Sequence, residues 1–190
     1  MEAISIKCPN CGASLGATSE VCDYCNSPVV IKSFKSVRTM PMPQVNKYVR
    51  SFTEQANEQN KLSFSLALCQ LRLKLYDMAL SNFEKAMEED YTNAHAYYYA
   101  VVSMLKGEKA FLLSKQNADQ CLEYLNAAIE IDPDPLFYYL SAYIRLDFYK
   151  RKFFNIKPSY EDMLEQAEDL SDDEIEEMFE LLGVERPEAM

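Results

Sequence analysis

The sequence predicts a mainly α-helical chain with a small β-containing segment at its N-terminus. Four of the six cysteines lie within the first 25 residues, and the whole chain of 190 residues has only four glycines. From about residue 43 onward, apolar residues recur at helical spacing. We expect residues 1–32 to form the cysteine-rich module, 33–42 a linker, 43–170 a helical domain, and 171–190 an acidic capping helix and tail.

The N-terminal module contains two Cys-x-x-Cys pairs separated by ten residues: Cys8, Cys11, Cys22 and Cys25. Each pair can place two thiolates on one side of a tight turn, and two facing turns form a tetrahedral four-sulfur site suited to Zn²⁺. Gly12 and Asn26 follow the pairs, and both residue types tolerate the left-handed backbone of such turns. Because so short a segment cannot fold on a hydrophobic core, we expect the metal to supply the folding free energy.

Over about residues 6–32 the chain resembles a zinc ribbon, with Cys-Pro-x-Cys-Gly, then Cys-x-Tyr-Cys, then an apolar stretch at 28–31 expected to form a strand. The resemblance implies one structural Zn²⁺ in a closed site. Two alternatives remain open. A pair of disulfides would require an oxidising compartment, whereas no secretory signal is evident at the N-terminus. A rubredoxin-like iron site usually has its cysteine pairs further apart.

The helical pattern begins with Pro43, which suits the first turn of a helix. One apolar stripe follows it: Val45, Tyr48, Val49, Phe52 and Ala56. From about residue 61 the same pattern of small and large apolar residues occurs three times. It returns after 34 residues, from Leu66 to Ala100, and then after 42 residues, from Ala100 to Ala142. An insertion of eight residues around 107–115 accounts for the difference between the two offsets.

Repeating units of about 34 residues, each made of two antiparallel helices, resemble tetratricopeptide repeats. The resemblance covers about residues 60–170, and these residues carry it: Leu66, Ala67, Ala79, Phe83, Ala86, Tyr97, Ala100, Val101, Cys121, Leu125, Ala128, Asp132, Pro133, Tyr139, Ala142, Tyr143 and Leu146. The chain departs from the pattern where no glycine follows Leu66, where Tyr91 replaces a terminal proline, and in a stretched loop at 151–157. A general array of helical hairpins is the alternative.

In tetratricopeptide arrays the first helix of each pair lines a concave groove. The resemblance therefore implies a partner groove lined by these residues: Phe64, Leu68, His95, Tyr98, Tyr99, Val102, Lys106, Phe137, Leu140, Ile144 and Phe148. Such a groove would suit an extended segment or a helix with hydrophobic anchors. The alternative is that many of these side chains are core residues or are covered by the C-terminal helices.

Two helices are predicted near the C-terminus. Ser159 begins the first, and Ser171 and Glu174 have the spacing of a capping box that begins the second. Gly183 is placed to end the second helix. Its apolar side either caps the helical array, which we favour, or occupies the groove and competes with a partner.

Charge is distributed unevenly along the chain. Residues 159–190 hold 13 acidic residues and one basic residue, a net charge of −12, and the other 158 residues sum to +1, which gives −11 overall. An acidic surface repels phosphates and weighs against nucleic acid as the main partner. The first 50 residues differ, with six Lys or Arg against three acids.

Catalytic motifs are not evident in the sequence. The single histidine, His95, has no Cys or Ser nucleophile near it in sequence, and no nucleophile elbow, Gly-rich phosphate loop or paired-carboxylate motif is found. We therefore expect a non-enzymatic adaptor or scaffold that binds a protein or peptide, with no role for a membrane and a cytoplasmic location. The alternative is a nucleic-acid-associated regulator whose helices recruit proteins. The oligomeric state stays open.

Overall fold

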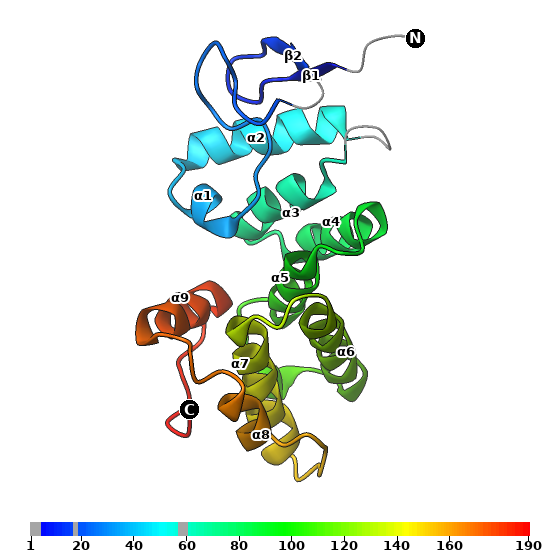
Figure 1. Ribbon diagram of the computed structural model, residues 1–190, viewed down its shortest axis with the longest axis vertical. Helices are drawn as coiled ribbons and strands as arrows, with labels where there is room; N and C mark the ends of the chain where they lie inside the picture. Colours follow the sequence, from blue (N-terminus) through cyan, green and yellow to red (C-terminus); the bar gives the residue numbers. More distant parts are fainter. Residues whose placement is uncertain (1–4, 17–18, 57–60) are drawn as a thin grey trace. The chain divides into compact units, whose positions relative to one another are not determined.

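The computed structural model describes residues 5–16, 19–56 and 61–190, and the chain divides into two compact units, residues 1–91 and 92–190. Within the described residues the one sheet has two antiparallel strands, β1 (Ser5–Lys7) and β2 (Ser14–Gly16), and the other elements are helical (Figure 1). The predicted mainly α fold with a small N-terminal sheet is confirmed. The division between the units falls within the segment 43–170 that was expected to be one helical domain.

The first unit places the small sheet against helices. Its helices are α1 (Phe34–Arg38), α2 (Met42–Gln55), α3 (Ser63–Arg72) and α4 (Tyr76–Glu89). The predicted apolar stripe of α2 is buried at Val45, Tyr48 and Phe52, because spacings of three and four residues place these side chains on one face. Helix α3 packs against both α2 and α4, which explains why nearly all of its residues are buried.

Two local expectations for the first unit differ from the structure. Residues 28–31 do not form a regular strand; Pro28 makes only an isolated antiparallel bridge with Val21, while Val29 and Ile31 turn into the core. The segment 33–42, expected to be a linker, contains α1, whose Val37 is fully buried. Both differences have one cause. The buried side chains of Val29, Ile31 and Val37 pack into the core of the first unit, and the local sequence does not reveal these contacts.

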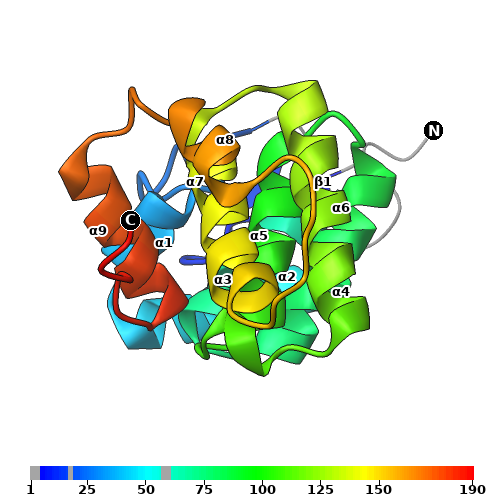
Figure 2. The same ribbon diagram turned by 90° about the horizontal axis from the view of Figure 1, so that it is seen from below.

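The second unit is also built from helices. They are α5 (Ala94–Leu105), α6 (Lys115–Ile131), α7 (Pro135–Ile144), α8 (Tyr160–Glu165) and α9 (Asp172–Leu182). Helices α5 to α8 pack in sequence order, and α9 packs back against α5 and α7. Helix α6 packs against α5 and α7, and α8 packs against α7 (Figure 2). The predicted insertion contains a short 3₁₀ turn, η1 (Ala110–Leu112), and α7 continues into a π-helical segment, η2 (Arg145–Lys150).

The predicted helix ends near the C-terminus are confirmed. Ser159 caps α8, and Ser171 and Glu174 form the reciprocal capping box of α9, which ends at Gly183 with a φ of 70°. The apolar face of α9 is buried, and the ring of Phe179 lies edge-on to two tyrosines of α7. Burial of this face is expected both for a helix that caps the array and for one that occupies the groove, so the preference for a cap stays a prediction.

Candidate metal centre

The four N-terminal cysteines converge, as predicted. All four Sγ atoms lie within 4.8 Å of one another, with 3.5 Å between Cys8 and Cys25 and 3.7 Å between Cys11 and Cys22. A tetrahedral site with metal–sulfur bonds of about 2.3 Å has sulfur–sulfur edges of about 3.8 Å. A disulfide would need about 2.05 Å. The cluster is therefore close enough to hold a metal ion and is not a pair of disulfides.

The first cysteine turn is closed by two backbone hydrogen bonds. Gly12 N–H donates to the carbonyl of Cys8 over 2.9 Å, and Cys8 N–H donates to the carbonyl of Ala13 over 2.8 Å. Gly12 has a φ of 77°, and no atom beyond Gly12 and its two neighbours in the chain lies within 4 Å of where its Cβ would be. Glycine is therefore favoured here by the backbone dihedral and not by crowding. Strands β1 and β2 pair directly outside this turn.

The second cysteine turn repeats the arrangement of the first. Asn26 N–H donates to the carbonyl of Cys22 over 2.8 Å, and Cys22 N–H donates to the carbonyl of Ser27 over 2.9 Å. Asn26 has a φ of 57°, which asparagine tolerates better than most residues. The Val21–Pro28 bridge closes this turn from outside. The two turns thus present their cysteine side chains from matching backbones.

Hydrogen bonds around the sulfurs connect the two turns. The side-chain amide of Asn10, in the first turn, donates to Ser27 Oγ over 2.9 Å and approaches Cys25 Sγ at 3.8 Å. Hydrogen bonds from the side chain and backbone of Ser27 lower the pKa of the Cys25 thiol to about 6. Burial raises the pKa of the Cys8 thiol to about 12 despite opposing backbone hydrogen bonds. A metal that binds the four sulfurs as thiolates must therefore displace the proton of Cys8.

Gln55, the last residue of α2, holds the outer edge of β1. Its Nε2 donates to the carbonyl of Lys7 over 3.0 Å, and its Oε1 accepts from the Lys7 backbone N–H. The other side of Lys7 pairs with Ser14 of β2. The side-chain amide of Gln55 thus takes the place that a third strand would occupy, directly before Cys8.

Two further side chains hold the segment that follows the second turn. Tyr48 of α2 donates its hydroxyl to the carbonyl of Pro28 over 2.7 Å. The buried hydroxyl of Ser65, on α3, accepts from the Ile31 N–H over 2.9 Å and donates to the Ile31 carbonyl over 3.0 Å. Sequence reasoning missed Gln55, Tyr48 and Ser65 in this role. The one available signal was a polar Ser65 inside an apolar run.

An open cleft of about 720 Å³ lies between the first cysteine turn and the polar side of α2. Three cations contribute to its walls, Lys7, Lys47 and Arg50, together with one acid, Glu54. Among the described residues none of the three cations makes an ion pair. The cleft therefore has a positive balance next to the cysteine cluster.

The structure buries most of the groove candidates. Eight of the eleven are buried: Leu68, Tyr98, Tyr99, Val102, Phe137, Leu140, Ile144 and Phe148. Phe64 and His95 are half-buried, and Lys106 is exposed. The ring of His95 lies edge-on to Tyr99 and Phe137 at centroid distances of 6.2 and 5.4 Å. Their burial matches the alternative that these side chains form the core, and their role in partner binding stays a prediction.

Within the part of the chain that the structure describes, no helix combines the length and the apolar character needed to cross a membrane. Comparisons of the chain with protein-family models, with curated proteins and with solved structures found no match.

Proposed function

We propose that this protein is a non-enzymatic adaptor whose N-terminal unit is held in shape by one structural Zn²⁺ and whose helical hairpins, similar to tetratricopeptide repeats, bind a protein or peptide. The observation that carries the proposal is the set of four converging thiols. Four thiolates complete the tetrahedral coordination of zinc and leave no open position for a substrate or a water. The metal then has a structural role, and the function of the chain is to bind other molecules through its surface.

Zinc is the preferred metal on chemical grounds. Thiolates select soft or borderline metals, and a closed four-sulfur set is one of the usual structural arrangements for zinc. The Asn10–Ser27 bond and the Gln55–Lys7 pair surround the cluster with the outer hydrogen bonds that orient metal ligands. These hydrogen bonds restrict the movement of the two cysteine turns, as expected for a structural metal site.

The test is a pull-down from native lysate with the intact chain and with a Cys8→Ser/Cys11→Ser variant, with bound metal quantified on both. A Cys69→Ala variant is the matched control, because Cys69 is a buried cysteine outside the cluster. We expect one zinc per intact chain and a specific protein partner. If the double variant loses the partner and Cys69→Ala keeps it, the N-terminal unit is the recognition element. If the double variant keeps the partner, the helices are. Absence of zinc, or of any partner, would contradict the proposal.

The second candidate function is nucleic-acid binding through the N-terminal unit. The cleft lined by Lys7, Lys47 and Arg50 favours it, because unpaired cations attract phosphates. A Lys47→Glu/Arg50→Glu variant tests it and leaves the cysteine cluster intact. Salt-dependent binding of single-stranded RNA or DNA that this variant abolishes would promote the second candidate. Equal weak binding by both proteins would dismiss it.

A further inference from the structure

The segment η2 ends in a turn that places Phe153 in the left-handed region of backbone space, with a φ of 60°. Phe153 N–H donates to the carbonyl of Lys150 over 3.1 Å, and Phe154 N–H donates to the carbonyl of Tyr149 over 2.8 Å. These two bonds form a Schellman motif, in which the left-handed residue is usually glycine. A bulky residue at this position is strained because its Cβ crowds the backbone.

The same chain contains this motif with glycine in place. At the end of α9, Gly183 has a φ of 70° and donates to the carbonyl of Glu180 over 3.2 Å, while Val184 donates to Phe179 over 3.3 Å. Where only the turn matters, glycine is the favoured residue. The end of α3 has the non-glycine residue Lys74 at the same position, so it is a phenylalanine with an exposed ring, and not the absence of glycine alone, that calls for a reason beyond the turn.

Packing within the chain does not provide that reason. The side chain of Phe153 is 95% exposed. Its neighbour Phe154 supplies the apolar contact of the motif, since its ring stacks on Phe148 at a centroid distance of 6.1 Å and lies 6.3 Å from that of Tyr149. Phe153 is thus an aromatic ring in a strained position that covers nothing in its own unit.

The segment that carries Phe153 is rich in cations. Residues 148–158 hold four cations and no acid, for +4, so the remainder of the chain carries −11 − 4 = −15. Lys152 lies over the rings of Phe148 and Phe111, at 3.8 and 4.8 Å from their centroids. Its Nζ also donates to the carbonyl of Leu113, next to Leu112, whose side chain is 66% exposed. Among the described residues Lys152 is the cation of this set that makes no ion pair, so its charge is the one beside the exposed ring with which a partner can still pair.

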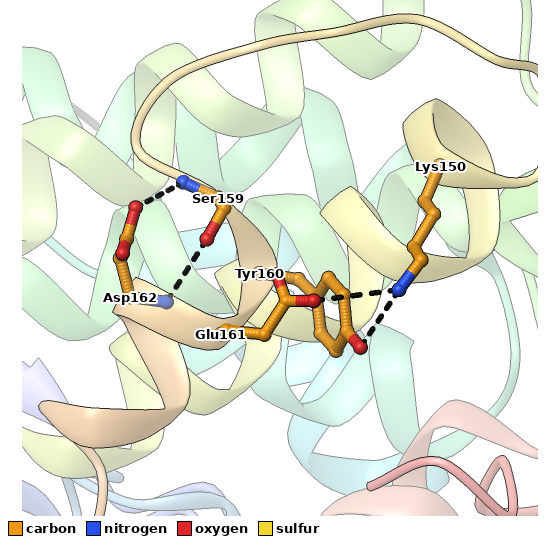
Figure 3. A network of polar contacts seen from close by, with 5 residues as sticks. All are labelled: Lys150, Ser159, Tyr160, Glu161 and Asp162. Atoms are coloured by element: carbon orange, nitrogen blue, oxygen red, sulfur yellow. Dashed lines mark hydrogen bonds and ion pairs between the residues drawn. The ribbon is translucent and has the colours of Figure 1, made fainter.

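The loop that carries Phe153 is held at both ends (Figure 3). Lys150, before the loop, donates to the Tyr160 hydroxyl over 2.9 Å and pairs with Glu161 at 3.3 Å. After the loop, Ser159 and Asp162 exchange the two hydrogen bonds of the α8 capping box. A fixed loop presents its exposed ring with little further entropy to lose on binding.

We infer that Phe153 is the anchor of a protein-docking surface and inserts into an apolar pocket on a partner protein, with one acidic group at the rim of that pocket to pair with Lys152. The inference rests on the proposed adaptor function and names one surface for it. Buried aromatic anchors supply much of the affinity of protein interfaces, and complementary charge around them sets specificity.

A protein partner fits this surface better than a nucleic acid or an anionic membrane. Three of the four cations already have acidic partners: Arg151 with Asp147, Lys150 with Glu161, and Lys157 with Asp162. Lys152 is thus the one cation of the four left to pair, which suits a single acidic group on a protein and not the many phosphates of a nucleic acid or an anionic membrane. The net charge of −15 on the rest of the chain also repels phosphates. The exposed ring is the dominant feature, and an apolar pocket is its complement.

The first part of the test replaces Phe153 with the photoreactive analogue p-benzoylphenylalanine in the full chain and irradiates it in cells. The same analogue at Met78, a 53% exposed position on α4, is the control. We expect an adduct with one protein from position 153 and not from 78. An adduct with nucleic acid or lipid, or no adduct, would overturn the inference.

The second part titrates the purified adduct partner against the intact chain, Phe153→Gly and Phe153→Leu. We expect Phe153→Gly to weaken binding at least tenfold, Phe153→Leu to weaken it less, and the melting temperature of Phe153→Gly to be equal or higher, because glycine relieves the strained turn. Lys74→Gly is the matched control. Lys74 is also left-handed, with a φ of 58°, in the same motif at the end of α3. It should leave affinity unchanged.

The outcomes separate this inference from the adaptor proposal. A partner that the intact chain retains, but that binds Phe153→Gly with unchanged affinity, would refute the anchor and leave the adaptor function standing. The absence of any partner of the intact chain would refute both.

Discussion

The side-chain amide of Gln55 pairs with both backbone groups of Lys7, one residue before the first cysteine of the cluster. The last residue of α2 thereby fixes the position of the strand that leads into the cysteine cluster. Tyr48, seven residues earlier, holds the segment that leaves the cluster through the Pro28 carbonyl. Because these two side chains join α2 to the cluster, we expect metal binding and the placement of α2 to be coupled.

The first prediction concerns this pair. Gln55→Ala removes both hydrogen bonds to Lys7, and because they lie at the surface we expect a loss of about 1 kcal/mol in the free energy of unfolding of the metal-loaded protein. Metal affinity, measured by competition with a chelator, should fall as well. Gln116→Ala, at an exposed position of α6, is the control. Unchanged metal affinity in Gln55→Ala would show that the pair does not support the site.

The second prediction concerns metal removal. Chelation should increase amide hydrogen exchange in β1, β2 and α2 while α6 and α7 keep their protection, because the contacts of the cluster lie within the first unit. Cys8→Ser/Cys11→Ser should reproduce the chelated pattern without a chelator. Equal loss of protection in both units would argue instead for a single cooperative fold that depends on the metal.

A third prediction tests the packing of α9. Phe179→Ala removes a buried ring that lies edge-on to Tyr139 and Tyr143, so we expect the free energy of unfolding to fall by about 3–5 kcal/mol. Denaturant titration measures it, and Met78→Ala, at an exposed position, should change little. If Phe179→Ala keeps full stability but binds a partner more tightly, α9 is a competitor for a partner site and not a cap.

The fourth prediction concerns pH. Burial raises the pKa of the Cys69 and Cys121 thiols to about 12, whereas in the unfolded chain they titrate near 9. Above pH 9 the unfolded chain therefore holds fewer protons than the folded chain, and stability that is fully present below pH 9 is lost as pH rises towards 12. Each thiol adds a slope of up to about 1.4 kcal/mol per pH unit.

The measurement for this pH prediction is denaturant titration between pH 7 and pH 11. Cys69→Ala and Cys121→Ala should each have a shallower alkaline slope than the intact chain. An identical slope in the variants would mean that other groups, such as the buried Tyr143 with its pKa raised to about 12, govern the alkaline loss.

Much of the site was predictable because it is local. The spacing of Cys8, Cys11, Cys22 and Cys25, with Gly12 and Asn26 after the pairs, defines two turns whose geometry needs only a few neighbouring residues. The helix ends at Ser159, Ser171 and Gly183 were predictable for the same reason. Caps and tight turns depend on contacts between residues that are close in sequence.

The groove residues illustrate where sequence reasoning ended. The resemblance to tetratricopeptide repeats implied that Tyr98, Phe137 and Ile144 line a groove, but a resemblance in sequence pattern does not reveal what covers these side chains. In the structure all three are buried. The same limit applies to residues 33–42, where buried Val37 makes a short helix out of an expected linker.

The sequence by itself determined the mainly helical fold, the helix ends and the four cysteines able to share a metal, because periodicity, capping and turn chemistry act over a few residues. Only the tertiary structure decided that Gln55, Tyr48 and Ser65 hold the cysteine turns, and that Phe153 is 95% exposed while Phe154, 44% exposed, stacks on Phe148. These relationships depend on residues that are distant in sequence or on the direction in which a turn points its side chains, and local patterns do not encode either.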